Sequence, residues 1–184
     1  MQPPHRDLLD ERLLHQPPET KGAIGHPRTA SARQDVQVPT RAEPGLAFCF
    51  VTDAGWAVGV VTHDRPKLGS LVWIAEPMFD EVPTVDQIQT IGRWRWPVFF
   101  SVTAALRKGL IDRVGTVEVP SDIAAFPVLR SGDRQIGWVA FTEVDGVRQR
   151  LGPTEDRSLP INQVVNDTRL KEMVVSGWRP DDEW

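Results

Sequence analysis

Cysteine is scarce in this chain and long hydrophobic runs are missing, and both shortages exclude classes of protein. The 184 residues include one cysteine, Cys49, which can neither form an internal disulfide nor build a zinc site by itself. No stretch approaches the roughly 18 uninterrupted apolar residues of a membrane span, and the N-terminus lacks the apolar core of a secretory signal. We therefore expect a cytoplasmic protein without a membrane partner, whose fold depends on a hydrophobic core.

An excess of charge of one sign is also missing. The 21 Lys and Arg residues against 25 Asp and Glu residues leave a net charge of −4, which is too mild to indicate nucleic acid or an anionic surface as a partner. Hydrophobic residues make up 40% of the chain, which is ordinary for one soluble domain.

Aromatic residues are absent from the first part of the chain. All seven Trp and all seven Phe lie at or after Phe48, whereas residues 1–43 hold six of the 16 Pro. A segment without aromatic anchors and rich in proline cannot build a core of its own. The sequence therefore predicts a disordered N-terminal arm over residues 1–43 and a β-rich domain over residues 44–184.

The second part has the pattern of a mainly β (α+β) fold. Residues 46–52 and 56–62 are apolar and flank Asp53-Ala54-Gly55, where the glycine suits a tight hairpin loop. Further strands are expected over residues 71–75, 96–105, 114–119 and 135–143, and Asp145-Gly146 predicts another hairpin turn. The expected architecture is a small antiparallel, strongly curved sheet or an open barrel.

Two segments have helical patterns. Thr84 and Gln87 form the spacing of a capping box ahead of a short helix that ends at Ile91. Near the C-terminus, Gly177 and then Pro180 follow apolar residues at near-helical spacing. These apolar residues are Ile161, Val164, Val165, Leu170, Met173 and Val174. We expect a C-terminal helix that packs on the sheet.

The alternation of arginine and tryptophan over residues 93–96 has two interpretations. Such a pairing can stack on bases and charge-pair with phosphates. The period of a strand instead directs Trp94, Trp96 and Val98 to the core, and Arg93 and Arg95 to water. Because acidic residues outnumber basic ones, the second interpretation is favoured and no nucleic-acid partner is expected.

Candidate catalytic residues are few. His63, the one histidine after residue 43, ends a predicted strand next to Asp64; it could act as a general base, but we interpret it as exposed surface. Cys49 lies between Phe48 and Phe50, so its side chain opposes theirs, and we interpret it as a buried structural thiol. We therefore expect no catalytic residues and no enzymatic activity.

Ligand-binding motifs are also missing from the sequence. It contains no His-x-x-x-His, no Cys-x-x-Cys and no glycine-rich phosphate loop, so neither a metal nor another cofactor is expected. Acidic pairs do occur in predicted loops, where solvated charge is the ordinary explanation. If the chain binds another protein, charged loop residues are the expected contacts, and these are Asp80, Glu81, Glu155 and Asp156.

Several segments follow one another in an order that resembles a known family. Residues 45–51 form a first apolar strand, and residues 55–61 form a second with small residues, Trp and Gly. Residues 96–102 form an apolar central strand, and residues 106–115 contain basic residues, Gly, bulky apolar residues and a second Gly. Residues 124–127 then form a loop with an aromatic residue. This order resembles the immunity protein 26 family, small β-rich proteins encoded beside toxins in bacterial polymorphic toxin systems.

Two functional hypotheses follow. The resemblance implies a cytoplasmic immunity protein that neutralises a cognate polymorphic toxin by direct, noncatalytic binding, and the mild negative charge suits a basic partner. The alternative is a small β-rich hydrolase or ligand-binding domain that uses His63 with a nearby Asp, either Asp64 or Asp53. The shortage of catalytic groups favours the immunity protein.

Overall fold

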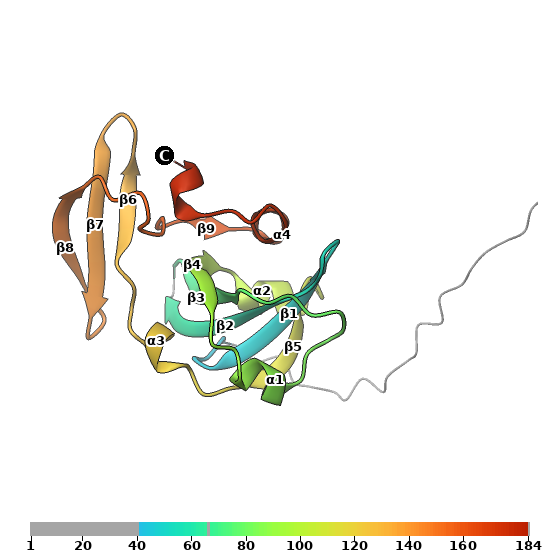
Figure 1. Ribbon diagram of the computed structural model, residues 1–184. Coiled ribbons are helices and arrows are strands. Elements are labelled where there is room, and N and C mark those ends of the chain that lie inside the picture. The colour runs from blue at the N-terminus through green and yellow to red at the C-terminus, as the bar shows by residue number, and fades with distance from the viewer. Residues whose placement is uncertain (1–40, 66, 184) are drawn as a thin grey trace, which may run out of the picture. The chain divides into compact units, whose positions relative to one another are not determined.

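The computed structural model describes residues 41–65 and 67–183 of the chain (Figure 1). The predicted N-terminal arm over residues 1–43 therefore lies almost entirely outside the described residues. Ala42, which that prediction assigns to the arm, is buried in the core. No helix of the described part is long and apolar enough to span a bilayer.

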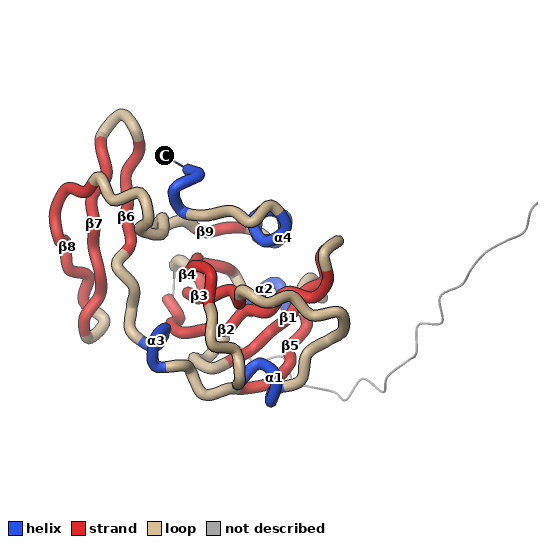
Figure 2. The backbone as a smooth tube through the Cα atoms, in the orientation of Figure 1, coloured by secondary structure: helices blue, strands red, loops and turns tan. Residues whose placement is uncertain are grey.

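The described chain is mainly β, as predicted, and Figure 2 shows how strands and loops dominate it. Six strands form one mixed sheet in the order β5-β1-β2-β3-β4-β9. Their bounds are β1 Leu46–Thr52, β2 Gly55–Arg65, β3 Gly69–Ala75, β4 Trp94–Phe100, β5 Asp112–Thr116 and β9 Val164–Val165. A second, antiparallel sheet contains β6 Leu129–Asp133, β7 Gly137–Val144 and β8 Val147–Thr154.

The expectation of a single antiparallel sheet or open barrel is wrong in two respects. The strands form two sheets, and the pairing of β9 with β4 in the larger one is parallel. Five short helices complete the described fold: α1 Val85–Gln89, α2 Val102–Arg107, α3 Ser121–Ala124, α4 Asp167–Val175 and the 3-10 helix η1 Pro180–Glu183.

Both predicted hairpins are confirmed. Thr52 pairs with Gly55 across a two-residue loop between β1 and β2. Gly55 has a φ of 117°, and a Cβ there would lie 2.7 Å from the Phe79 carbonyl oxygen. In the β7–β8 hairpin, Asp145 and Gly146 both have positive φ, as a type I′ turn requires.

The six-stranded sheet is covered on both faces, which explains the continuous apolar runs of its strands. Five successive residues of β1 are buried. Phe48 and Phe50 belong to the core cluster on one face, where α2 and α4 pack, whereas Cys49 belongs to a second cluster with Ile88 of α1. This confirms the prediction that the side chain of Cys49 points to the opposite face of the sheet from those of Phe48 and Phe50.

The C-terminal helix is confirmed, but it is shorter than the pattern predicts. Leu170, Met173 and Val174 of α4 are buried against the sheet, and Asn166 caps the helix by accepting from the Arg169 backbone N–H at 2.8 Å. The preceding apolar residues, over 164–165, form β9 and pair with β4. A short apolar run fits strand and helix equally well, so its periodicity could not separate them.

The predicted strand over residues 96–105 is also corrected. It is β4 only as far as Phe100, and helix α2 follows. Val102 and Ala105 are buried three positions apart, which is the spacing of one helical face, and alanine favours the helix.

A β-bulge overturns the predicted placement of Trp94. The pairing of β4 with β3 shifts register between Trp73 and Ala75, so two residues of β4 oppose one of β3. Trp96 therefore packs in the cluster on the α4 face, and Trp94 packs with Cys49 on the opposite face. A strict period of two, as assumed from the sequence, misses this reversal.

Backbone hydrogen bonds connect the two sheets. The Arg130 N–H of β6 donates to the Pro160 carbonyl oxygen at 2.9 Å, and the Asn162 N–H donates back to Arg130 at 2.8 Å. The residue after Asn162 is Gln163, and its carbonyl oxygen accepts from the Phe99 N–H of β4 at 3.3 Å. The segment before β9 thus lies between β6 and β4 and pairs with both.

Candidate functional site

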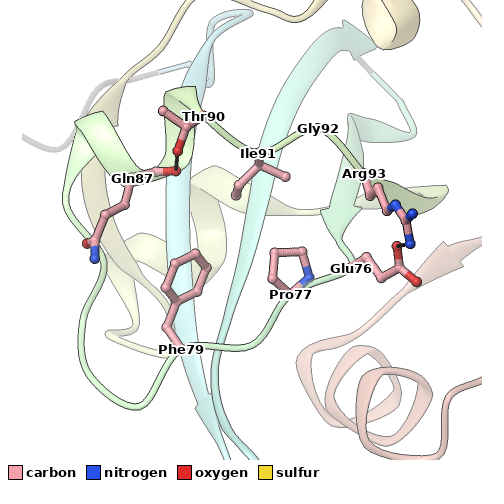
Figure 3. Close-up of a pocket in the computed structure, with 8 residues that line it drawn as sticks. All are labelled: Glu76, Pro77, Phe79, Gln87, Thr90, Ile91, Gly92 and Arg93. Atoms are coloured by element: carbon pink, nitrogen blue, oxygen red, sulfur yellow. Dashed lines mark hydrogen bonds and ion pairs between the residues drawn. The ribbon is translucent and has the colours of Figure 1, made fainter.

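Two loops beside α1 border a solvent-open apolar pocket of about 480 Å³, whose lining residues are drawn in Figure 3. One loop connects β3 to α1 and the other connects α1 to β4. Phe79, Pro77 and Ile91 supply the apolar surface. The complete lining consists of Glu76, Pro77, Phe79, Gln87, Thr90, Ile91, Gly92 and Arg93.

The first loop is held in place by backbone pairing. The Trp56 N–H of β2 donates to the Phe79 carbonyl oxygen at 2.7 Å, and the Phe79 N–H donates to Trp56 at 3.0 Å. The Phe79 side chain packs against the core cluster that contains Ile91. Phe79 is thereby fixed at the pocket, which reduces the entropic cost of binding there.

Helix α1, between the two loops, is fixed by hydrogen bonds at both of its ends. The predicted capping box is confirmed, since Thr84 Oγ1 accepts from the Gln87 N–H at 3.3 Å and Gln87 Oε1 accepts from the Thr84 N–H at 2.8 Å. At the other end, Thr90 Oγ1 donates to the Gln87 carbonyl oxygen at 2.9 Å (Figure 3). Both termini of this short helix are therefore satisfied by local hydrogen bonds.

The surroundings of the apolar pocket are acidic. Asp80 and Glu81 directly follow Phe79 and are exposed, and Asp86 is exposed on the first turn of α1. Glu76 and Arg93 form a loose ion pair at 3.8 Å on the rim (Figure 3). Residues 76–93 contain four carboxylates and one arginine, so the local charge favours a cationic ligand surface.

The other predicted acidic pair lies outside this pocket. Glu155 and Asp156 are exposed and follow β8. Asp156 accepts the Ser158 hydroxyl at 2.6 Å and the Ser158 N–H at 2.9 Å, and these bonds lower the pKa of its carboxyl group. Asp80 and Glu81 thus directly follow Phe79, which lines the apolar pocket, whereas Glu155 and Asp156 neither line the pocket nor adjoin a lining residue.

His63 is half-buried, so its interpretation as exposed surface is wrong. A bulge in β2 between Val61 and His63 turns the imidazole toward the α3–β6 connection, where it meets the Phe126 ring edge-on at 5.3 Å. Burial lowers its pKa, with Arg65 adding to this effect and Glu143 opposing it.

The alternative hypothesis pairs His63 with an aspartate. Asp53 precedes β2, whereas His63 lies near the end of this strand. Along an extended strand the two residues are about 26 Å apart. The structure therefore does not bring them together. Asp64 and His63 line one hollow of about 380 Å³. Their side chains have separate partners there: His63 Nδ1 lies 3.1 Å from Thr62 Oγ1, whereas Asp64 accepts from Arg41 and Ser70.

Cys49 has the environment of a structural thiol. It is completely buried. Burial, and secondarily the charge of Asp112, raises its pKa to about 12. A thiol in this state is not a nucleophile at neutral pH.

Metal ligands do not gather in the described part of the chain, where no three His, Cys, Asp or Glu side chains could hold an ion together. Comparisons of the chain with protein-family models, with curated proteins and with solved structures find no match.

Sequence reasoning identified the acidic loop but missed the cavity beside it. Asp80 and Glu81 were recognisable as charged loop residues. The apolar residues Pro77, Met78 and Phe79 immediately before them, inside a predicted loop, were the pattern that could have indicated a pocket. The packing of Phe79 against the cluster that contains Ile91 depends on the chain turning back through α1, which no local pattern specifies.

Proposed function

We propose that this chain is an immunity protein that neutralises a cognate polymorphic toxin by direct, noncatalytic binding in the cytoplasm of the producing cell. The observation that carries the proposal is the apolar pocket at Phe79 and Ile91, together with the exposed carboxylates Asp80 and Glu81 that directly follow Phe79 in the chain. A cavity with an apolar centre and a charged rim is the usual arrangement of an interface hot spot.

The partner segment that fits this site is basic and carries one apolar or aromatic side chain. That side chain would enter the pocket against Phe79, Pro77 and Ile91. Lys or Arg residues beside it would approach Asp80 and Glu81. Charge complementarity of this kind increases the association rate and selects the partner, while the buried anchor slows dissociation.

The environments of the two potential catalytic groups support binding over hydrolysis. The high pKa of Cys49 keeps its thiol protonated. The His63 imidazole packs on Phe126, and its Nδ1 is within hydrogen-bond distance of Thr62 but of no carboxylate among the described residues. A hydrolytic base needs an orienting partner and access to substrate.

The test is co-expression with the toxin encoded by the neighbouring gene, with growth as the readout. The double variant Asp80→Lys, Glu81→Lys reverses the two exposed charges that directly follow Phe79, and we expect it to lose growth rescue. The matched control is Glu155→Lys, Asp156→Lys, which reverses two exposed carboxylates away from the pocket and should keep rescue.

Two further variants separate binding from chemistry. His63→Ala and Cys49→Ala should both rescue growth when they are folded, as judged by circular dichroism. Loss of rescue in a folded form of either variant would favour a catalytic mechanism. Full rescue by Asp80→Lys, Glu81→Lys would overturn the assignment of the pocket.

A further inference from the structure

Strand β8 forms an open edge of the three-stranded sheet (Figure 1). It pairs with β7 on one side, and no strand of the described chain pairs with it on the other. Its first five residues, 147–151, are all exposed, so no described segment covers this part of the edge. An open edge presents unpaired backbone N–H and C=O groups to a further strand. The apolar pocket proposed as the toxin site does not include it.

The turn of the β7–β8 hairpin determines which backbone groups of β8 point to the open edge. Val144 and Val147 flank a two-residue loop, and the residues that flank such a loop form a hydrogen-bonded pair. Hydrogen-bonded and non-hydrogen-bonded pairs alternate along an antiparallel ladder. Gln149 therefore bonds to β7 as Val147 does, whereas the N–H and C=O groups of Arg148 and Arg150 point to the open edge.

The same two arginines give this edge a positive charge. Strand β8 contains Arg148, Arg150 and no carboxylate, and both arginines are exposed. The Arg148 guanidinium lies 3.7 Å from the centre of the Phe141 ring, and neither arginine forms an ion pair in the described chain. Glu143 of β7 lies opposite Arg148, but its carboxylate is bound by Arg65. Two guanidinium groups are therefore available to a partner strand.

The far end of β8 limits the length of a partner segment. The ladder shifts register after Arg150, which leaves Leu151 as an extra residue, and Pro153 has no backbone N–H to donate. A bulge and a proline interrupt the hydrogen bonding of an edge strand. The regular part of the edge thus extends from Val147 to Arg150, and a short segment is enough to cover it.

A second copy of this chain does not fit the edge. Antiparallel pairing of two β8 strands in the register centred on Gln149 would place Arg148 of each copy opposite Arg150 of the other. Like charges directly opposite each other destabilise a strand pair, and charged residues commonly protect edges from self-association in this way. The charge of β8 instead favours a strand that carries carboxylates.

We propose that β8 binds an extended acidic segment of another protein, which adds a strand to the three-stranded sheet. The backbone of this segment pairs with the outward N–H and C=O groups of Arg148 and Arg150, and two of its carboxylates lie opposite the two guanidinium groups. Its apolar side chains pack beside Val147 and Leu151, which are 63% and 55% exposed. Backbone hydrogen bonds supply affinity, and opposite charges across the strands select an acidic sequence.

The test is an NMR titration of the full, isotope-labelled chain with the blocked peptide acetyl-Val-Glu-Thr-Glu-Val-amide. We expect saturable binding and slower solvent exchange of the Arg148 and Arg150 amides, because these N–H groups gain acceptors. The amides of Val147 and Gln149 already donate to β7, so their exchange should change less. The matched peptide with Lys in place of both Glu residues should bind about tenfold more weakly.

Charge reversal on the chain should exchange this preference. Arg148→Glu, Arg150→Glu alters two exposed side chains, so it is not expected to unfold the chain, and it should bind the Lys peptide more tightly than the Glu peptide. The matched control is Arg107→Glu, Lys108→Glu, which reverses two exposed charges at the end of α2 and should keep the original preference.

Three results would overturn the proposal. The first is absence of saturable binding at millimolar Glu peptide, and the second is equal affinity for both peptides. The third is protection of the Arg148 and Arg150 amides in concentrated protein without peptide, which would indicate pairing of two copies. None of these results bears on growth rescue, which tests the toxin-binding function separately.

Discussion

The six-stranded sheet and the three-stranded sheet bury their strands differently. In β1, the first five residues are buried, because apolar clusters cover both faces of the larger sheet. In β8, an edge strand, the first five residues are all exposed. The larger sheet is therefore stabilised mainly by apolar burial, and the smaller one must depend more on specific polar contacts.

Those polar contacts are arginine side chains. Arg130 of β6 is completely buried, and its guanidinium donates to the carbonyl oxygens of Leu159 at 3.0 Å and Pro180 at 2.6 Å. It also lies 4.3 Å from the centre of the Trp138 ring. Arg65 of β2 forms a partly buried ion pair with Glu143 of β7, which connects the two sheets. Directional contacts of this kind fix the smaller sheet without a large core.

The largest expected effect is loss of a core side chain in the larger sheet. Phe48→Ala should reduce the free energy of unfolding by about 3–5 kcal/mol, because the ring is fully buried and lies over Gly59. Leu151→Ala on β8, where the side chain is exposed, should change it by less than about 0.5 kcal/mol. Urea unfolding measures both, and equal losses would remove the contrast between the sheets.

A smaller effect is expected from Arg130→Met, which keeps much of the side-chain length but removes the donors to Leu159 and Pro180. We expect the free energy of unfolding to decrease by about 2–4 kcal/mol, because two hydrogen bonds from a charged donor are removed inside the protein. Arg148→Met is the matched control, because Arg148 is exposed on β8 over the Phe141 ring. If both arginine variants unfold at the urea concentration of the unmodified chain, polar contacts do not hold the smaller sheet.

The smallest effect concerns pH at the junction of the sheets. Burial lowers the pKa of His63 in the folded chain below its ordinary value of 6.5. As the pH decreases below 6.5, the unfolded state therefore binds more protons than the folded state. The free energy of unfolding decreases with the pH until the lowered pKa is reached. His63→Gln should flatten this part of the profile. Identical pH profiles of thermal unfolding for His63→Gln and the unmodified chain would contradict the lowered pKa of His63.

The parts of the fold that follow local rules were predictable from the sequence. The Asp53-Ala54-Gly55 and Asp145-Gly146 turns and the capping box at Thr84 depend on neighbouring residues only. The reversal of Trp94 and the turning of His63 toward Phe126 both follow from bulges, which depend on the register of the partner strand. A bulge adds one residue and inverts every later assignment of faces, so a period of two cannot detect it.

In the candidate site, too, features set by neighbouring residues were predictable and features set by distant residues were not. The charge of Asp80 and Glu81 was evident from their positions in a loop. The apolar pocket beside them forms because Phe79 pairs with Trp56 and packs with Ile91, which are contacts between residues distant in the sequence. The buried role of Arg130 was missed for the same reason, since its acceptors lie 29 and 50 residues further along the chain.

Hydrogen exchange of the full chain, alone and with the purified product of the neighbouring gene as the candidate toxin, tests the proposed function most directly. If the apolar pocket receives a side chain of the toxin, amides over residues 76–93 should exchange more slowly in the complex. Residues 155–158 should exchange at unchanged rates. Protection confined to other segments, with residues 76–93 unchanged, would contradict the account.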